Sequence, residues 1–364
     1  MLKNPYRSRK IVKDLSAALH EEARNLEHHK IMHVCGTHEH EINRFGLRQL
    51  LPDNISLIAG PGCPVCITPA SVIVTAIALA LQPDNPIFCT YGDMVRVPTS
   101  EGSILDSRGK GADVRVVYSI REAISLAVEN PERRVVFLSV GFETTAAPVA
   151  ATVKAGLPDN FLMYCCHRYV PTAVEALTAV DKGNISGYLL PGHASVITGI
   201  EPYSFLPERY NRAAALSGFE PVDILAALLS IVRQIRRGQP VVANCYKRAV
   251  RDSGNRKARA VLAEVFDCTD ASWRGIGILP GTGFELKEEY ERYDALTRYE
   301  MEELEAEDVM KGCICHLVLT GQSRPDECGL FGKACTPLNP QGPCMVSIEG
   351  TCRALFLYPE ENDV

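Results

Sequence analysis

Short apolar runs alternate along this chain with longer helical stretches, and this alternation restricts the possible folds more than any other feature of the sequence. The runs are continuously apolar, which is typical of strands covered on both faces. Strands that alternate with helices favour parallel sheets, in which ligands bind at the carboxyl ends of the strands. The predicted strands are 30–34, 55–59, 87–90, 114–118, 135–140, 161–165, 188–190 and 241–243, and the predicted helices are 70–81, 120–129, 146–155, 172–180 and 222–237.

The length of 364 residues is too great for one ordinary core and favours two or three domains. We expect an α/β fold with two similar parallel-sheet domains, at 31–130 and 131–250. A smaller, loop-rich domain is expected at 251–364. The segment 1–30, with an amphipathic stretch at 11–30, is a candidate to pack against this third domain.

The third domain changes character along its length. Residues 288–311 are charged and predict a helix. Residues 311–352 hold six glycines, four prolines and six cysteines. A segment with so little periodicity needs a covalent or metal staple, and we expect a metal centre there.

Composition excludes several classes of protein. Fourteen cysteines without an apolar export signal indicate metal or thiol chemistry in the cytoplasm rather than a secreted disulfide framework. The net charge of -6 argues against a nucleic-acid partner. The longest apolar stretch, 72–81, is about half of the ~20 residues that a membrane span requires, so no membrane association is expected.

The cysteines of the tail are too irregularly spaced for zinc knuckles, because Cys313 and Cys315 are one residue too close and no other pair is near enough. Iron–sulfur clusters accept looser spacing. The alternative is a set of buried free thiols. Composition favours a cluster but does not select four ligands from the six candidates, which are Cys313, Cys315, Cys328, Cys335, Cys344 and Cys352.

A second cysteine group, Cys63-Pro-Val-Cys66, follows a predicted strand and a Gly-Pro-Gly turn and precedes a predicted helix. A pair with this spacing at a helix N-terminus is typical of thioredoxin-like redox sites, because the helix dipole favours the thiolate. Half of a zinc site, two metal-binding thiolates and an inert structural pair are the alternatives.

The third group, Cys35-Gly-Thr-His-Glu-His-Glu41, places a thiol, two imidazoles and two carboxylates directly after a predicted strand. Cys35 and His38 would share a face of a helix that begins at the glycine. They are candidates for a nucleophile and its base, or for two ligands of a soft metal. A polar helix start with a buried cysteine is the simpler interpretation. Because Cys35 and Cys63 both follow strands, the two groups are candidates to meet at one sheet edge.

Together these motifs resemble the HypD family of NiFe-hydrogenase maturation proteins, over nearly the whole chain. In addition to the two cysteine motifs, the similarity includes Gly-Phe-Glu-Thr-Thr at 141–145, Leu-Pro-Gly-His at 190–193, Gly-Phe-Glu-Pro at 218–221 and Gly-Pro-Cys-Met-Val-Ser at 342–347. The tail spacing is similar to the family's cluster pattern. The resemblance selects Cys313, Cys328, Cys335 and Cys352 as ligands of a 4Fe-4S cluster and leaves Cys315 and Cys344 as neighbours.

The resemblance implies a cytoplasmic scaffold on which the Fe(CN)2(CO) group of NiFe hydrogenases is assembled, with HypC-like and HypE-like partners. Cys35 would then anchor a mononuclear iron, with His38 as a second ligand or a hydrogen-bonding neighbour. Cys63 and Cys66 would either bind iron or cycle between dithiol and disulfide, with electrons from the cluster. Glu349 is a candidate proton carrier, with a surface carboxylate as the alternative.

Two rival functions stay open at this point. The first is an iron–sulfur-dependent thiol–disulfide oxidoreductase that acts on a protein substrate and does not need Cys35. The second is a zinc-stapled binding module without a redox role. As a scaffold, the protein would be an assembly factor with redox capacity rather than an enzyme that turns over a substrate.

Overall fold

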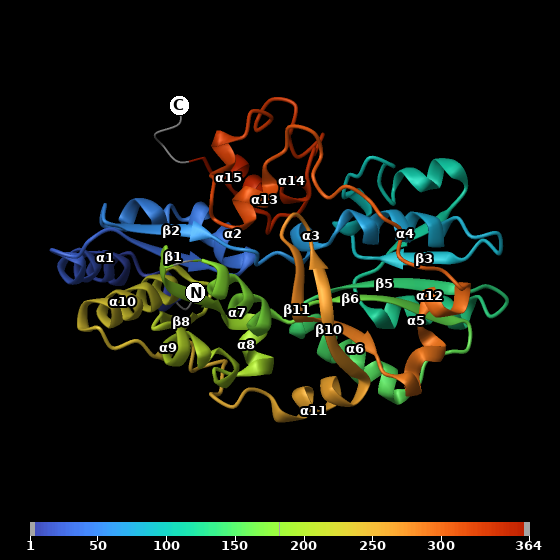
Figure 1. Ribbon diagram of the computed structural model, residues 1–364, viewed down its shortest axis with the longest axis horizontal. Coiled ribbons are helices and arrows are strands. Elements are labelled where there is room, and N and C mark those ends of the chain that lie inside the picture. Colours follow the sequence, from blue (N-terminus) through green and yellow to red (C-terminus); the bar gives the residue numbers. More distant parts are fainter. Residues whose placement is uncertain (1–3, 182, 360–364) are drawn as a thin grey trace.

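Two parallel β-sheets form the body of the protein and lie side by side along its long axis (Figure 1). The computed structural model describes residues 4–181 and 183–359. The first sheet has the strand order β2-β1-β7-β8-β9, and the second has the order β4-β3-β5-β6. The predicted α/β class with two parallel sheets is therefore confirmed. The strands are β1 His29–His33, β2 Ile55–Ala59, β3 Ile87–Thr90, β4 Asp113–Val116, β5 Val135–Gly141, β6 Phe161–His167, β7 Ile185–Pro191, β8 Ala213–Ser217 and β9 Val242–Asn244.

The strands are not grouped in the order that the sequence suggested. After β1 and β2 the chain builds the whole second sheet and then returns, so that β7 pairs with β1, with Met32 opposite Tyr188. The expected division at 31–130 and 131–250 therefore cuts across both sheets. Local periodicity identifies a strand but does not encode which distant strand it pairs with, so this grouping was outside what the pattern could predict.

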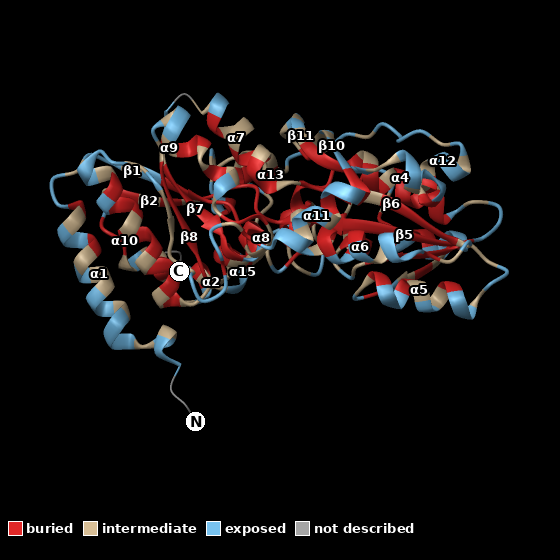
Figure 2. Ribbon diagram, turned by 90° about the horizontal axis from the view of Figure 1, so that it is seen from below, coloured by how far each residue is buried: buried red, intermediate tan, exposed pale blue. Residues whose placement is uncertain are grey.

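Helices cover both faces of each sheet, and an apolar core lies on each face (Figure 2). None of the helices in the described residues is both long and apolar enough to cross a membrane. The helices of this part are α1 Arg9–Ala23, α2 Gly36–Arg44, α3 Pro64–Ile67, α4 Ala70–Ala80, α5 Ile120–Glu129, α6 Glu143–Ala155, α7 Val170–Val180, α8 Gly192–Thr198, α9 Phe205–Tyr210 and α10 Pro221–Arg237, with 3-10 turns at Pro5–Arg7, Leu47–Leu50 (η2), Met94–Arg96, Asp106–Lys110 (η4) and Glu201–Tyr203.

The N-terminal helix α1 packs against α10 on the first sheet, not against the tail. Its Leu19 is fully buried in the same apolar cluster as Ile224 and Leu228 of α10. Arg233 Nε donates to Glu22 Oε1 at 2.9 Å along the same contact. The expectation that residues 1–30 join the third domain is therefore wrong for the described residues, because the amphipathic face of α1 completes the core under the first sheet.

After α11 (Arg256–Val265) the chain forms an antiparallel hairpin of β10 (Phe266–Trp273) and β11 (Gly277–Leu286), which the sequence analysis did not predict. In Figure 1 this hairpin stands at the junction between the two sheets.

The helix expected at 288–311 is wrong over most of its length, since only Glu288–Tyr293 (3-10) and α12 (Ala295–Tyr299) are helical. The acidic residues that follow bond to neighbouring elements instead of forming their own helix. Glu303 accepts from Tyr164, and Asp308 accepts from the Ala70 N–H at the start of α4.

The tail consists of short helices joined by loops and lies above the junction of the sheets (Figure 1). Its apolar residues Met345 and Val346 join the core between the second sheet and helices α3 and α4. Its elements are α13 Cys315–Leu319, a 3-10 turn at Pro325–Glu327, α14 Pro343–Val346 and α15 Thr351–Leu357.

Candidate functional site

Cys35 and Cys63 lie together at the carboxyl edge of the first sheet. They follow the parallel neighbours β1 and β2 and are the N-cap residues of α2 and α3. The Gly36 N–H donates to the Gly62 carbonyl at 2.9 Å, which ties the two loops together. A Cβ at Gly62 would lie 2.1 Å from the Cys35 nitrogen, so only glycine allows this approach.

Cys63 and Cys66 form a disulfide, with their Cα atoms 5.2 Å apart. Both residues are buried, at 3% and 0% exposure. The Cys66 N–H also lies 3.2 Å from Cys63 Sγ, and Pro64 occupies the first turn of α3. On its other side Cys66 Sγ is 3.9 Å from the carbonyl oxygen of Pro343, at the start of α14. The disulfide therefore lies between the Cys35 edge and helix α14 of the tail.

A cavity of about 210 Å³ opens beside Cys35 at the junction of the two sheets. The glycine-containing motifs that follow β5 and β7 both contribute to the lining of this cavity, and Glu349 of the tail contributes as well. Hydroxyl, imidazole and carboxylate groups thus face one thiol across a partly apolar space. The lining residues include Val34, Cys35, Thr37, Gly62, Phe142, Thr144, Thr145, His193, Ala194 and Glu349.

The carboxylate of Glu349 affects the pKa of the Cys35 thiol. The pKa of Cys35 is raised to about 12, chiefly by burial and then by Glu349, against the opposing effect of the His38 and Thr37 N–H groups. Burial also raises the pKa of Glu349, while a hydrogen bond from Thr37 Oγ1 at 2.7 Å lowers it. Glu349 is therefore not the plain surface carboxylate that was the alternative for it.

His38 is fully buried and lies outside the lining of the Cys35 cavity. Its Nε2 donates to the Gly218 carbonyl at 2.9 Å, because a carbonyl can only accept. Burial lowers the pKa of His38 to about 3, so the ring is neutral. The ring packs on Phe219 at 4.8 Å, and Phe219 packs on His193 at 3.9 Å. His38 thus supports the loop that backs His193.

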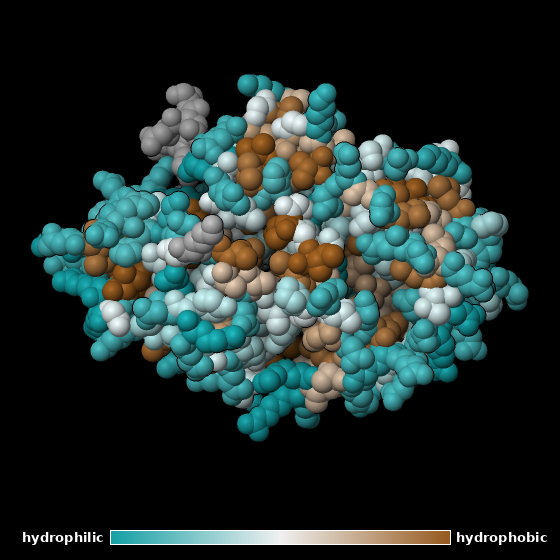
Figure 3. All heavy atoms as spheres, viewed as in Figure 1, coloured by the Kyte–Doolittle hydropathy of each residue, from teal (hydrophilic) through white to brown (hydrophobic). Residues whose placement is uncertain are grey.

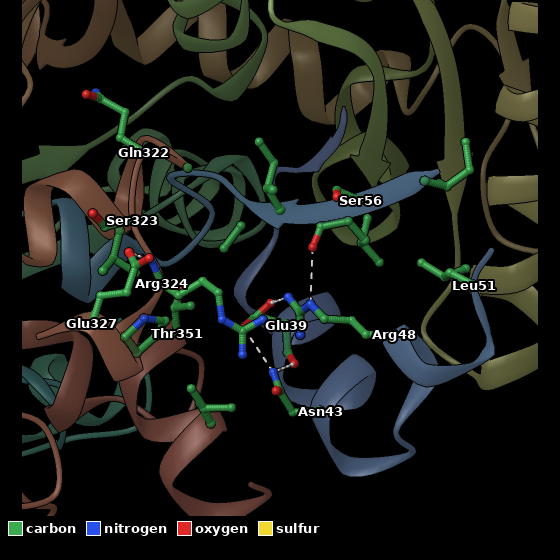
Figure 4. A pocket seen from close by; sticks show the side chains of 18 of the residues that line it. Glu39, Asn43, Arg48, Leu51, Ser56, Gln322, Ser323, Arg324, Glu327 and Thr351 are labelled. Carbon is green, nitrogen blue, oxygen red and sulfur yellow. Dashed lines mark hydrogen bonds and ion pairs between the residues drawn. The ribbon is translucent and has the colours of Figure 1, made fainter. Parts of the chain in front are cut away.

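Glu39, in the same motif, is the centre of a buried network that the sequence analysis missed. Its Oε2 lies 2.6 Å from His33 Nε2. The same oxygen accepts from Arg48 Nη2 at 2.6 Å, and Oε1 accepts from Asn43 Nδ2 at 2.9 Å (Figure 4). Burial alone would raise the pKa of Glu39, but Arg48 and His33 hold it well below its usual range. The carboxylate borders a cavity of about 440 Å³ between β2 and the tail. The sequence signal that could have identified Glu39 was its place within the Cys35 motif, directly after His38.

All six tail cysteines line one small, mainly apolar pocket. The neighbouring Cys313 and Cys344 lower the pKa of Cys315 well below its usual value. Cys315 and Cys352 in turn raise the pKa of Cys344. Within residues 4–181 and 183–359, no group of three or more His, Cys, Asp or Glu side chains is arranged to hold a single metal ion. The donor set of soft thiols in an apolar shell nevertheless fits a sulfur-ligated cluster, although the pocket does not distinguish the four expected ligands from Cys315 and Cys344.

These features define a class: a two-sheet α/β protein with a thiol, a disulfide and a six-cysteine pocket gathered where the sheets meet the tail. The family model described as "HypD: Hydrogenase formation hypA family" matches residues 10–359. The chain belongs to the HypD family.

Curated relatives agree with this assignment. The chain is 41% identical to hydrogenase maturation factor HypD2 of Bradyrhizobium diazoefficiens, over 98% of this chain and 97% of the relative. It is 40% identical to hydrogenase maturation factor HypD of Cupriavidus necator, over 99% and 97% of the two chains. The same factor of Escherichia coli is 40% identical over 98% of each chain.

Proposed function

We propose that this protein is a hydrogenase maturation factor that holds a mononuclear iron at Cys35 while the Fe(CN)2(CO) group is assembled on it. The names of the relatives support the general role. The observation that carries the finer role is the position of Cys35 in a cavity at the junction of both sheets and the tail, next to the Cys63–Cys66 disulfide. A low-spin ferrous ion with cyanide and carbonyl ligands prefers a soft thiolate donor, which Cys35 supplies.

The residues around Cys35 fit the requirements of iron binding. The thiol must lose its proton to bind iron. Burial and Glu349 raise its pKa, and the N–H groups at the start of α2 offset part of that increase. Glu349, held by Thr37, is placed to accept that proton. His193, supported from behind by Phe219, lies across the cavity as a candidate second contact to the iron. His38 acts in this proposal through Phe219 rather than as a ligand.

We further propose that the tail holds a 4Fe-4S cluster on Cys313, Cys328, Cys335 and Cys352. When bound, the cluster would supply electrons one at a time. Converting the Cys63–Cys66 disulfide to two thiols takes two electrons and two protons, so two successive electrons from an external one-electron donor are required. The 3.9 Å contact of Cys66 Sγ with Pro343, next to Cys344 of the pocket, supports this pairing of sites.

A HypC-like partner with an N-terminal cysteine and a HypE-like cyanide donor complete the proposal. Such partners require a surface near the cavity. Hydrophobic residues are visible on the tail among otherwise hydrophilic ones (Figure 3). Ile348, which is 50% exposed, directly precedes Glu349 of the cavity. This part of the tail is the place where we expect the small partner to dock.

A thiol–disulfide oxidoreductase that acts on a protein substrate is the second candidate, and the disulfide itself favours it. Both sulfurs are buried, however, which hinders direct attack by an external thiol. The scaffold role requires Cys35, whereas the oxidoreductase role does not.

The decisive experiment compares Cys35→Ser with the control Cys268→Ser, which removes an exposed thiol. Both variants and the wild type are purified without oxygen together with the small partner, and iron and acid-labile sulfide are measured. We expect Cys35→Ser to lose its non-cluster iron while it keeps its sulfide, with Cys268→Ser unchanged. Unaltered iron in Cys35→Ser, with normal circular dichroism, would exclude the scaffold role.

A further inference from the structure

Arg274 is a buried positive charge in a turn that packs against His316, the residue after Cys315 of the cysteine pocket. It lies in the turn between β10 and β11 and is 1% exposed. Its Nε donates to the Asp308 carbonyl at 2.7 Å, and its Nη2 donates to the Pro98 carbonyl at 3.1 Å. Its Nη1 is buried without a hydrogen-bond partner among the described residues.

No carboxylate forms an ion pair with Arg274 within residues 4–181 and 183–359. The carboxylate of Asp308 is used elsewhere, since its oxygens accept from the N–H groups of Ala70 and Gly275. A buried guanidinium without an anionic partner is costly. Burial lowers the pKa of Arg274, whereas the anionic forms of Cys315, Asp308, Cys344 and Cys313 favour its charge. Because the Asp308 carboxylate makes its hydrogen bonds elsewhere, the cysteine pocket is a second source of negative charge for Nη1, which has no partner among the described residues.

The backbone fixes Arg274 between the disulfide and this pocket. Its N–H donates at 2.8 Å to the carbonyl of Ile67, the last residue of the helix that carries Cys66. The next residue, Gly275, has φ +67°, and a Cβ there would lie 2.4 Å from the Cβ of His316. The turn is thus held against α3 on one side and against the residue after Cys315 on the other.

We propose that Arg274 is the electrostatic partner of the metal centre in the tail, a positioning residue that stabilises negative charge in the cysteine pocket and raises the one-electron reduction potential of the centre. This rests on the proposed function, in which the pocket holds an iron–sulfur cluster. Each added electron increases the negative charge of a thiolate-ligated centre, and a fixed positive charge in a water-poor pocket favours the reduced state. Arg274 has no role in this proposal as a ligand.

The test is an anaerobic redox titration of the full-length protein with dithionite, monitored by electron paramagnetic resonance. Arg274→Gln removes the charge and Arg274→Lys keeps it. Arg298→Gln, at an exposed position, removes the same charge where water screens it. We expect the reduced-to-oxidised ratio of Arg274→Gln to fall about tenfold at fixed potential, a shift of about 59 mV for one electron. Arg274→Lys and Arg298→Gln should titrate like the wild type.

The outcomes separate this inference from the function on which it rests. Wild-type protein without acid-labile sulfide would overturn the proposed cluster and the inference with it. A normal cluster with an unchanged potential in Arg274→Gln, or an equal shift in Arg274→Lys, would overturn the inference alone. Where Arg274→Gln fails to retain the centre, the result for Arg274→Lys decides. If Arg274→Lys retains the centre at the wild-type potential, the positive charge is required and the inference is supported. If both variants lose the centre, the inference is overturned.

Discussion

At the scale of single residues, the edge that carries Cys35 depends on one buried carboxylate. Glu39 joins β1 through His33, η2 through Arg48 and its own helix through Asn43. Removing one member of a buried, paired network leaves the remaining charges without compensation. The position of α2, and hence of Cys35 at its N-terminus, therefore depends on the Glu39 network, although Glu39 does not line the Cys35 cavity.

We expect Glu39→Gln to lower the free energy of unfolding at pH 7 by about 3 kcal/mol, because Arg48 and His33 lose their charged partner. The folded-state pKa of Glu39 is depressed, so its contribution is present above the ordinary pKa of about 4.3 and is lost as the pH falls below it. The stability difference between wild type and Glu39→Gln should therefore narrow below about pH 4.3.

Denaturant unfolding of both proteins at neutral and acidic pH measures this difference. Glu27→Gln, at an exposed position, serves as the control. Its free energy of unfolding should equal that of the wild type at both pH values. A difference that stays constant or grows toward low pH would show that Glu39 is not held as a carboxylate.

At the scale of elements, the site is made of helices that begin directly after strands. The helices α2, α3, α6 and α8 are the next helices after β1, β2, β5 and β7, and their N-cap residues and first turns supply most of the cavity lining. The close approach of the first two depends on Gly62, whose added Cβ would overlap the Cys35 backbone.

Gly62→Ala should therefore lower the free energy of unfolding by about 3 kcal/mol, since neither backbone can move without disturbing its sheet. Gly109→Ala is the matched control, because no atom lies within 4 Å of its added Cβ and η4 is near the surface. Its effect should stay within about 0.5 kcal/mol. Equal stability of the two variants in denaturant unfolding would show that the loops do not touch as described.

The same elements show what the sequence could predict. The strands 55–59 and 87–90 and the helix 120–129 have the expected bounds, because apolar runs and amphipathic spacing are local signals. The strand β8 was missed because its Ala-Ala-Ala-Leu-Ser sequence has a low intrinsic strand preference and is stabilised by its neighbours β7 and β9. The polar, glycine-rich hairpin β10–β11 was missed for a similar reason, since tertiary contacts stabilise it.

The residues of the candidate site likewise include some that the sequence could predict and some that it could not. Cys35 and Cys63 could be expected to approach each other because both follow strands of one parallel sheet. Arg48 could not be assigned to the Glu39 network, nor Arg274 to the turn beside His316, because each reaches its neighbours only through the folded chain. Distant residues of this kind carry no local pattern that a single sequence reveals.

At the scale of the whole molecule, the tail connects the two sheets. Glu349 bonds to Thr37 beside the first sheet, and Pro343 contacts Cys66. Arg96, in the segment after β3 of the second sheet, donates to the Val346 carbonyl at 3.4 Å. In the proposed function, the buried disulfide lies between two iron sites, a cluster in the tail and a mononuclear ion at Cys35.

The measurement that tests this claim most directly is a Mössbauer spectrum of protein grown on enriched iron and purified without oxygen together with its small partner. We predict a 4Fe-4S signal and a separate low-spin ferrous component, of which Cys35→Ser removes only the ferrous component. A cluster signal alone in well-loaded wild-type samples, or a ferrous component that persists in Cys35→Ser, would contradict it.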